Sequence, residues 1–153
     1  FHLLSQILSN QSGRLFVNLR DKKGLAYSVG SFIFEFPEAS FFNLYIGTSP
    51  EKVETAKIGL INEIKDLFFS GITDDEIKKA KNQIIFNYSE LMQKSSDISS
   101  TLVQNHIFFD NPFHFKNFID EIKQIDANNF INQIKDYFKD ENAFFIVLNG
   151  KEG

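Results

Sequence analysis

The sequence contains no cysteine, no tryptophan, one methionine and three prolines among its 153 residues. The lack of cysteine excludes a disulfide framework, a thiolate metal site and a cysteine nucleophile, but it does not separate a cytoplasmic from a periplasmic location. No apolar run approaches the roughly 18 residues that a membrane-spanning helix needs. Basic residues are few, with 16 Lys and Arg against 20 Asp and Glu, so no basic patch favours nucleic-acid binding.

The three histidines do not form a zinc motif. His2, His106 and His114 lie far apart, and none has H-E-x-x-H or H-x-x-E-H spacing. Because a catalytic zinc needs about three protein ligands, we expect no metal site in this chain. The sequence also lacks a G-x-S-x-G nucleophile motif and a glycine-rich phosphate loop. Paired acids such as those in 74–76 are better explained by helix capping.

Phenylalanine dominates what is present, with 19 copies in a chain that is 42% hydrophobic. We expect most of these rings in a core, and this length suits a single domain spanning 1–153. The chain starts at Phe1 rather than at a methionine. We therefore expect it to be a piece of a longer protein.

The first third of the chain predicts helices followed by a β-hairpin. Apolar residues recur at helical spacing up to Ser9 and again before Gly24, which is suited to ending a helix. Two β-type runs then flank a turn, and the first run is apolar on both faces at its far end, which favours a strand covered on two sides. The predicted elements are helices 1–9 and 12–24, strands 25–36 and 41–48, and a turn at 37–40.

Helices dominate the rest of the sequence. A capping box, Thr73 with Glu76, marks one helix start, and Gly71 ends the helix before it. A last apolar run of strand length is closed by Asn149-Gly150. The order predicts an α+β domain with a mostly antiparallel sheet that is short of strands. The predicted helices are 53–70, 73–91, 102–109, 112–122 and 126–138, and the last strand is 143–148.

One stretch, residues 12–28, brings together two side chains suited to peptide binding. Arg20 falls in the last turn of a short helix, and Tyr27 falls on the following strand, with the turn at Gly24 between them. A guanidinium and a phenol can both donate hydrogen bonds to the carbonyl oxygens of an extended peptide. The plainer interpretation is a helix-capping arginine and a surface tyrosine, and spacing alone favours it.

The amino-acid sequence of this stretch resembles that of a known family. The segment SGRLFVNLRDKKGLAYSV, residues 12–29, closely resembles the hallmark of the second, non-metal domain of the pitrilysin, insulysin and mitochondrial processing peptidase family. The resemblance covers essentially the whole chain, and its most specific element is the spacing of seven between Arg20 and Tyr27. Three further segments resemble parts of that domain, namely GTSPEKV (47–53), GITDDEIKKAK (71–81) and FFIVLNG (144–150).

The resemblance implies half of a peptidase active site. Family members face two α/β halves across a cavity, each with helices packed on one face of its sheet, and the first half carries zinc in an H-x-x-E-H motif. By this resemblance Arg20 binds the substrate backbone, and Tyr27 is catalytic, stabilising the oxyanion as zinc-bound water attacks. Zinc is expected in a partner domain, in the same chain or another subunit. Since family members have strands before the helix at which this sequence begins, we expect those strands to be missing from it.

Three functions stay open. We favour the substrate-positioning half of an active zinc endopeptidase, because the Arg and Tyr pattern is intact. A non-catalytic partner or structural subunit is the alternative, since some family members lack the metal half. An unrelated α+β interaction module is a third, because topology assigns no function. An upstream H-x-x-E-H separates the first two, whereas the sequence leaves the peptide substrate and a dimeric state open.

Overall fold

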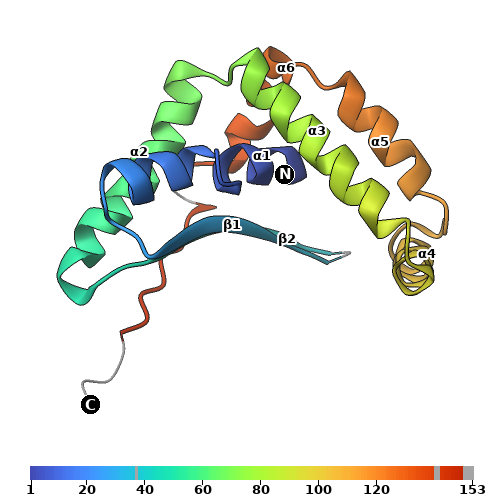
Figure 1. Ribbon diagram of the computed structural model, residues 1–153, viewed down its shortest axis with the longest axis horizontal. Helices are drawn as coiled ribbons and strands as arrows, with labels where there is room; N and C mark the ends of the chain where they lie inside the picture. Colours follow the sequence, from blue (N-terminus) through green and yellow to red (C-terminus); the bar gives the residue numbers. More distant parts are fainter. Residues whose placement is uncertain (37, 140–141, 150–153) are drawn as a thin grey trace.

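The computed structural model describes residues 1–36, 38–139 and 142–149. Helices lie over one face of a two-stranded antiparallel sheet, as Figure 1 shows. The prediction of an α+β fold with an antiparallel sheet and helices on one face is therefore confirmed. Within the described residues the sheet has two strands rather than the predicted three.

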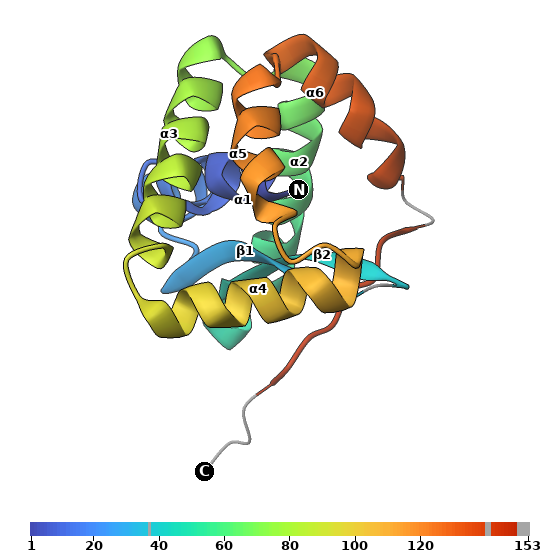
Figure 2. The same ribbon diagram turned by 90° about the vertical axis from the view of Figure 1, so that its right-hand side faces the viewer.

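The elements follow the expected order, with shifted bounds. The first part of the chain forms α1 (His2–Ser9), the π-helix η1 (Phe16–Lys22), β1 (Ser28–Glu35) and β2 (Ser40–Gly47). The second part forms η2 (Pro50–Lys52), α2 (Val53–Ser70), α3 (Asp74–Leu91), α4 (Ser95–Phe109), α5 (Phe115–Gln124), α6 (Ala127–Ile134) and η3 (Lys135–Tyr137). Figure 2 shows α4 near the level of the sheet, below α3 and α5.

The hairpin has one covered face and one open face. Residue alternation in the β1–β2 register sends Val29 and its partner Ile46 toward the helices, where Ser5 and Ser9 of α1 also hydrogen-bond the Ser31 hydroxyl. On the opposite face the aromatic rings are 41–58% exposed. The expectation that this strand is covered on two sides is wrong, because the helices of the described residues pack against the other face. The exposed rings are Phe32, Phe34, Phe41 and Tyr45.

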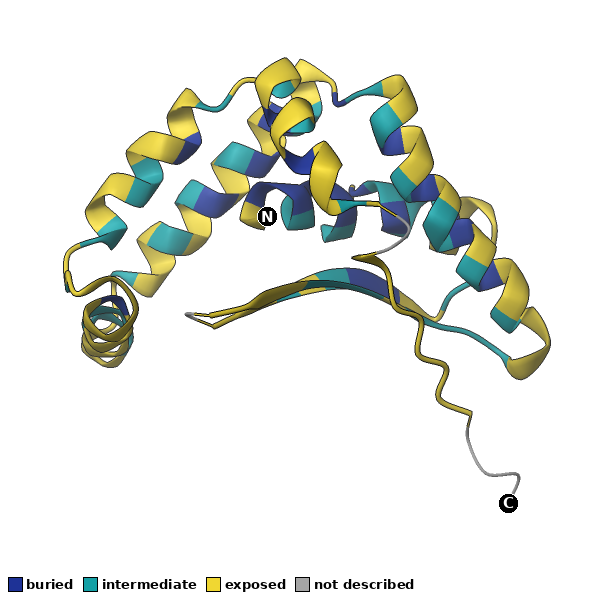
Figure 3. Cartoon of the chain, turned by 180° about the vertical axis from the view of Figure 1, so that it is seen from behind, coloured by how far each residue is buried: buried dark blue, intermediate teal, exposed yellow. Residues whose placement is uncertain are grey.

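Helix α1 forms the centre of the core. Its apolar side is almost completely buried, as the dark segments in Figure 3 show. It contacts both β1 and α3, so it joins the sheet to the helical layer. Burial of each such leucine stabilises the fold by about 1.5–3 kcal/mol. The residues of this side are Leu3, Leu4, Ile7 and Leu8.

A forked ion pair ties the start of the chain to the α2–α3 corner. Arg14 donates from Nε to Glu76 Oε1 at 2.6 Å and from Nη2 to Oε2 at 2.9 Å. The same Nη2 donates to the Gly71 carbonyl at 2.6 Å. Glu76 also completes the capping box with Thr73, which confirms that prediction. Burial alone raises the pKa of Glu76, but the hydrogen bonds from Arg14 and Thr73 outweigh it and lower the pKa to about 2.

The π-helix η1 packs against α2 at Gly59. The side chain of Leu19 is fully buried, and a Cβ placed on Gly59 would lie 3.0 Å from Leu19 Cδ2 and 3.5 Å from Leu25 Cδ1. The absence of a side chain at Gly59 therefore allows η1 to approach α2 closely. The buried residues of α2 are Ala56, Gly59, Glu63 and Leu67.

Two predicted strands differ from the structure. The first starts at Ser28 instead of residue 25, because the Leu25 N–H donates to the Leu19 carbonyl and ends η1 instead of joining the sheet. The strand predicted over 143–148 is wrong. Phe144 and Leu148 are both 91% exposed, and the segment runs away from the hairpin (Figure 1), so its backbone pairs with neither open edge of the sheet. The predicted turn residues Pro37 and Gly150 lie outside the described residues.

We predict that Glu76→Gln destabilises the protein by about 1–3 kcal/mol at pH 7, the range for hydrogen bonds to charged groups near a surface. The folded-state pKa of Glu76 is below its ordinary value of 4.5, so this contribution is complete above pH 4.5 and is lost as the pH falls toward 2. Urea unfolding followed by circular dichroism at pH 7, 4.5 and 3 should show that the difference in the free energy of unfolding between the variant and the parent becomes smaller as the pH falls. The exposed pair Asp75–Lys79 supplies the control Asp75→Asn, for which we expect little change.

We also predict that Gly59→Val is destabilising by about 1–3 kcal/mol, because its methyl groups overpack Leu19. Gly59→Ala should change stability little, since the helical preference for alanine, about 1 kcal/mol, offsets the tight contact. Thermal unfolding measures both effects. Lys65→Val, on the exposed side of α2, controls for valine in a helix, and a Gly59→Val protein no less stable than that control would contradict the close approach.

Candidate functional site

The predicted site arginine lies on η1. This segment is a π-helix rather than the expected α-helix, and such wide turns occur frequently at functional sites. Gly24, with φ of +57°, ends it in the left-handed conformation and donates its N–H to the Arg20 carbonyl at 3.1 Å. The Arg20 guanidinium is exposed and lies over the Phe16 ring, 4.6 Å from its centroid. Its donors therefore face solvent from a fixed stem.

The predicted site tyrosine immediately precedes β1. The N–H of Tyr27 donates to the Gly47 carbonyl at 2.8 Å, which joins this residue to the end of the hairpin. Its side chain is 81% exposed, so the phenol is accessible. Arg20 and Tyr27 thus occupy the two sides of the turn at Gly24, in the predicted order, although Tyr27 lies one residue before the strand and not on it as predicted. A direct contact between the two side chains stays a prediction.

A small pocket of about 150 Å³ lies beside Tyr27. Lys52 projects into this region and donates from Nζ to the Gly24 carbonyl at 3.2 Å. The buried Thr48 Oγ1 has no hydrogen-bond partner among the described residues. The pocket therefore presents polar groups next to the exposed phenol. It is lined by Gly24, Leu25, Ala26, Tyr27, Thr48, Ser49 and Lys52.

Sequence reasoning missed the buried carboxylate under this site. Glu63 is only 4% exposed and accepts a hydrogen bond from Asn18 Nδ2 at 2.7 Å. Its other oxygen lies 3.6 Å from Lys23 Nζ. A signal was present, because Glu63 stands four residues after Gly59 and four before Leu67, on the side of α2 that faces the core.

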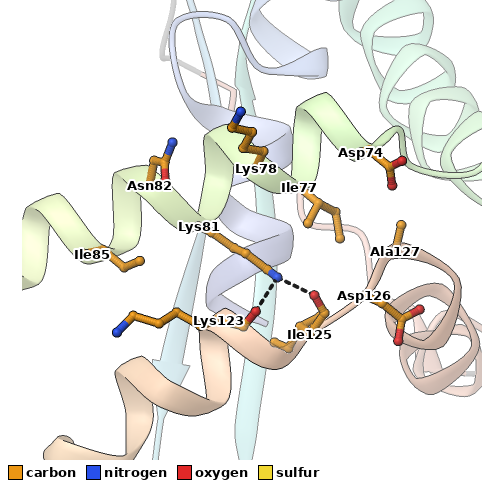
Figure 4. A pocket seen from close by; sticks show the side chains of 10 residues that line it. All are labelled: Asp74, Ile77, Lys78, Lys81, Asn82, Ile85, Lys123, Ile125, Asp126 and Ala127. Carbon is orange, nitrogen blue, oxygen red and sulfur yellow. Dashed lines mark hydrogen bonds between the residues drawn. The ribbon is translucent and has the colours of Figure 1, made fainter.

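The larger pocket, about 360 Å³, lies away from Arg20 and Tyr27. Figure 4 shows it between α3 and the α5–α6 connection. Lys81 crosses the gap and donates from Nζ to the carbonyls of Lys123 and Ile125, so it holds the end of α5 against α3. This lysine has a structural explanation. The lining residues are Asp74, Ile77, Lys78, Lys81, Asn82, Ile85, Lys123, Ile125, Asp126 and Ala127.

The described residues do not fit a zinc site. Across 1–36, 38–139 and 142–149, no three His, Cys, Asp or Glu residues gather in a group that could hold a metal ion. The buried carboxylate of Glu63 is engaged with Asn18. Arg20 and Tyr27 can donate hydrogen bonds, but neither can supply a metal ligand set.

In the part of the chain that the structure describes, no helix is both long and apolar enough to cross a membrane.

Comparison with known sequences places the chain in a family. Residues 1–84 match the family described as Peptidase M16 inactive domain. The chain is 32% identical over 126 residues to an uncharacterized zinc protease of Rickettsia bellii, covering 80% of this chain and 30% of that protein. An uncharacterized zinc protease of Rickettsia felis is 28% identical over 127 residues, or 83% of this chain and 31% of that protein. The chain thus spans less than a third of the length of these two relatives.

Solved structures agree on the fold. The inactive peptidase domain of a Bordetella parapertussis zinc protease matches with a TM-score of 0.83 and 17% identity, over 92% of this chain and 77% of that one. A protease from Helicobacter pylori matches with a TM-score of 0.81 and 21% identity, over 92% of this chain and 34% of that one. The resemblance noted in the sequence is confirmed: the chain belongs to the M16 peptidase family, as an inactive domain of its zinc proteases.

Proposed function

We propose that this domain positions a peptide substrate for a zinc-carrying domain outside the chain. The observation that carries the proposal is the turn at Gly24, which presents an exposed Arg20 on one side and an exposed Tyr27 on the other. The family is one of zinc proteases, and the described residues offer no metal site of their own. A positioning role therefore suits this domain better than a role in generating the nucleophile.

Arg20 is suited to hold the peptide backbone. Its guanidinium is planar, always charged and carries five N–H donors in a fixed fork. Stacking on Phe16 limits the side chain to few orientations, which lowers the entropy lost when a peptide carbonyl binds. Two of the five N–H donors can bond one carbonyl oxygen of an extended chain, because that oxygen accepts through two lone pairs. Arg20 therefore acts on the substrate before any bond breaks.

Tyr27 is suited to act on the reacting carbonyl. Its hydroxyl can donate one hydrogen bond to the oxygen that becomes negatively charged when the peptide bond is attacked. The backbone bond to Gly47 anchors the residue at the hairpin end, so the phenol is carried on a rigid element, as a catalytic donor requires.

We predict that Tyr27→Phe in the intact peptidase lowers kcat about ten- to a thousandfold, the range for loss of one oxyanion donor. The variant keeps the ring and loses only the hydroxyl, so the fold should be unaffected. Steady-state cleavage of a fluorogenic peptide measures the effect. Tyr45→Phe, at another exposed tyrosine on the open face of the sheet, is the matched control and should keep the parental rate. An unchanged rate for Tyr27→Phe removes this residue from catalysis.

We predict that Arg20→Ala in the intact peptidase lowers kcat/KM about ten- to a hundredfold, mainly through KM, because hydrogen bonds to a charged group are lost. Arg20→Lys should recover only part of this, since an ammonium lacks the planar fork. Lys78→Ala, on the exposed side of α3, controls for the loss of one cation. Zinc content, measured by mass spectrometry, should stay at the parental level, and its loss would assign Arg20 a folding role instead.

A further inference from the structure

We propose that Glu63 is a positioning residue: its contacts from α2 hold η1, and thereby Arg20, in the orientation that substrate binding needs. This inference rests on the proposed function, since it concerns the same arginine. It assigns a role to a buried carboxylate on α2 whose hydrogen bond and ion pair within the described residues go to Asn18 and Lys23.

The geometry of the brace is specific. One oxygen of Glu63 accepts from Asn18 Nδ2 at 2.7 Å, and the other lies 3.6 Å from Lys23 Nζ. Asn18 precedes Arg20 by two residues and Lys23 follows it by three, so the two partners enclose the arginine along the chain. A single carboxylate thereby contacts side chains on both sides of the functional residue, Asn18 within η1 and Lys23 just after it.

A second contact shows that the brace acts on a fixed support. Gly59, one helical turn before Glu63 on the same side of α2, meets the fully buried Leu19, the residue next to Arg20. Leu19 fixes how closely η1 approaches α2, and Glu63 fixes its rotation. Because neighbouring residues of a helix point in different directions, burying Leu19 turns Arg20 outward.

Burying a carboxylate costs free energy, which indicates that the contact between Glu63 and Asn18 serves to place η1 and not to stabilise the core. Glu63 and Asn105 are the two polar residues buried in the described part of the chain. A buried charge costs free energy that partners must offset, and half-exposed Lys23 offsets little of it. An apolar residue would serve the core at least as well. What an apolar residue lacks is a directional bond to Asn18.

The test uses the intact peptidase and four single variants: Glu63→Leu, Glu63→Gln, Asn18→Ala and Arg20→Ala. We expect Glu63→Leu and Asn18→Ala to lower kcat/KM about tenfold, mostly through KM, whereas Glu63→Gln retains an acceptor for Asn18 and stays close to the parent. In an Arg20→Ala background, Glu63→Leu should lower kcat/KM by less than about twofold, because the effects of residues that act through one another are not additive. Asn18→Ala tests the same bond should Glu63→Leu fail to fold.

Ile84→Ala, a buried change on α3 away from η1, is the control for general loss of stability. Amide hydrogen exchange in residues 16–24 should accelerate in Glu63→Leu and stay parental in Ile84→Ala, compared at equal distance below each Tm. Arg20→Ala with parental kcat/KM would overturn the proposed function itself. Suppose that Arg20→Ala lowers kcat/KM as expected. The positioning role alone is then overturned if Glu63→Leu has the same kcat/KM as Ile84→Ala, or if the effects of Glu63→Leu and Arg20→Ala on kcat/KM are fully additive.

Discussion

The ion pair between Arg14 and Glu76 joins positions 62 residues apart and sets the frame for everything that follows it. It fixes where the chain leaves α1, and it does so on a glutamate that already caps α3. From that point η1 reaches α2 with Leu19 packed against Gly59. The packing of η1 on α2 then sets the positions of the turn at Gly24 and of the start of β1. A charged contact in the helical layer thus determines where an arginine and a tyrosine stand on the surface.

The hairpin depends on the helices more than they depend on it. A two-stranded sheet is marginal alone, and here its stability comes from one face, where Val29 meets the core and Ser31 bonds to α1. The opposite face is a set of half-exposed aromatic rings. Ring contacts within that face, such as Phe32 with Phe34 at 5.3 Å between centroids, order it without burying it. The domain therefore presents a stiff aromatic surface on the side away from its helices.

Local signals in the sequence predicted the elements well, and non-local contacts account for what was missed. The capping box at Thr73, the helix-ending glycines 24 and 71, and the Phe41 strand each depend on residues within a few positions. The strand predicted over 143–148 failed because pairing depends on a neighbouring edge, which composition does not reveal. Arg20 and Tyr27 became candidates through a family pattern. Glu63 was missed because its partners, Asn18 on η1 and Lys23 just after it, lie 40 or more residues away in the sequence.

The π-helical form of η1 has a consequence for how this segment can change in length. Hydrogen bonds in a π-helix span one residue more than in an α-helix, so one deletion between Phe16 and Lys22 would convert the turn to an ordinary one. Because the wide turn itself holds the extra residue, the segments before and after it would stay nearly in phase, while side chains within the turn would change direction, since successive residues of an ordinary α-helix lie about 100° apart around its axis. Leu19 and Arg20 lie within the turn. A change of length here would therefore disturb both, whereas a substitution on its outer surface would not.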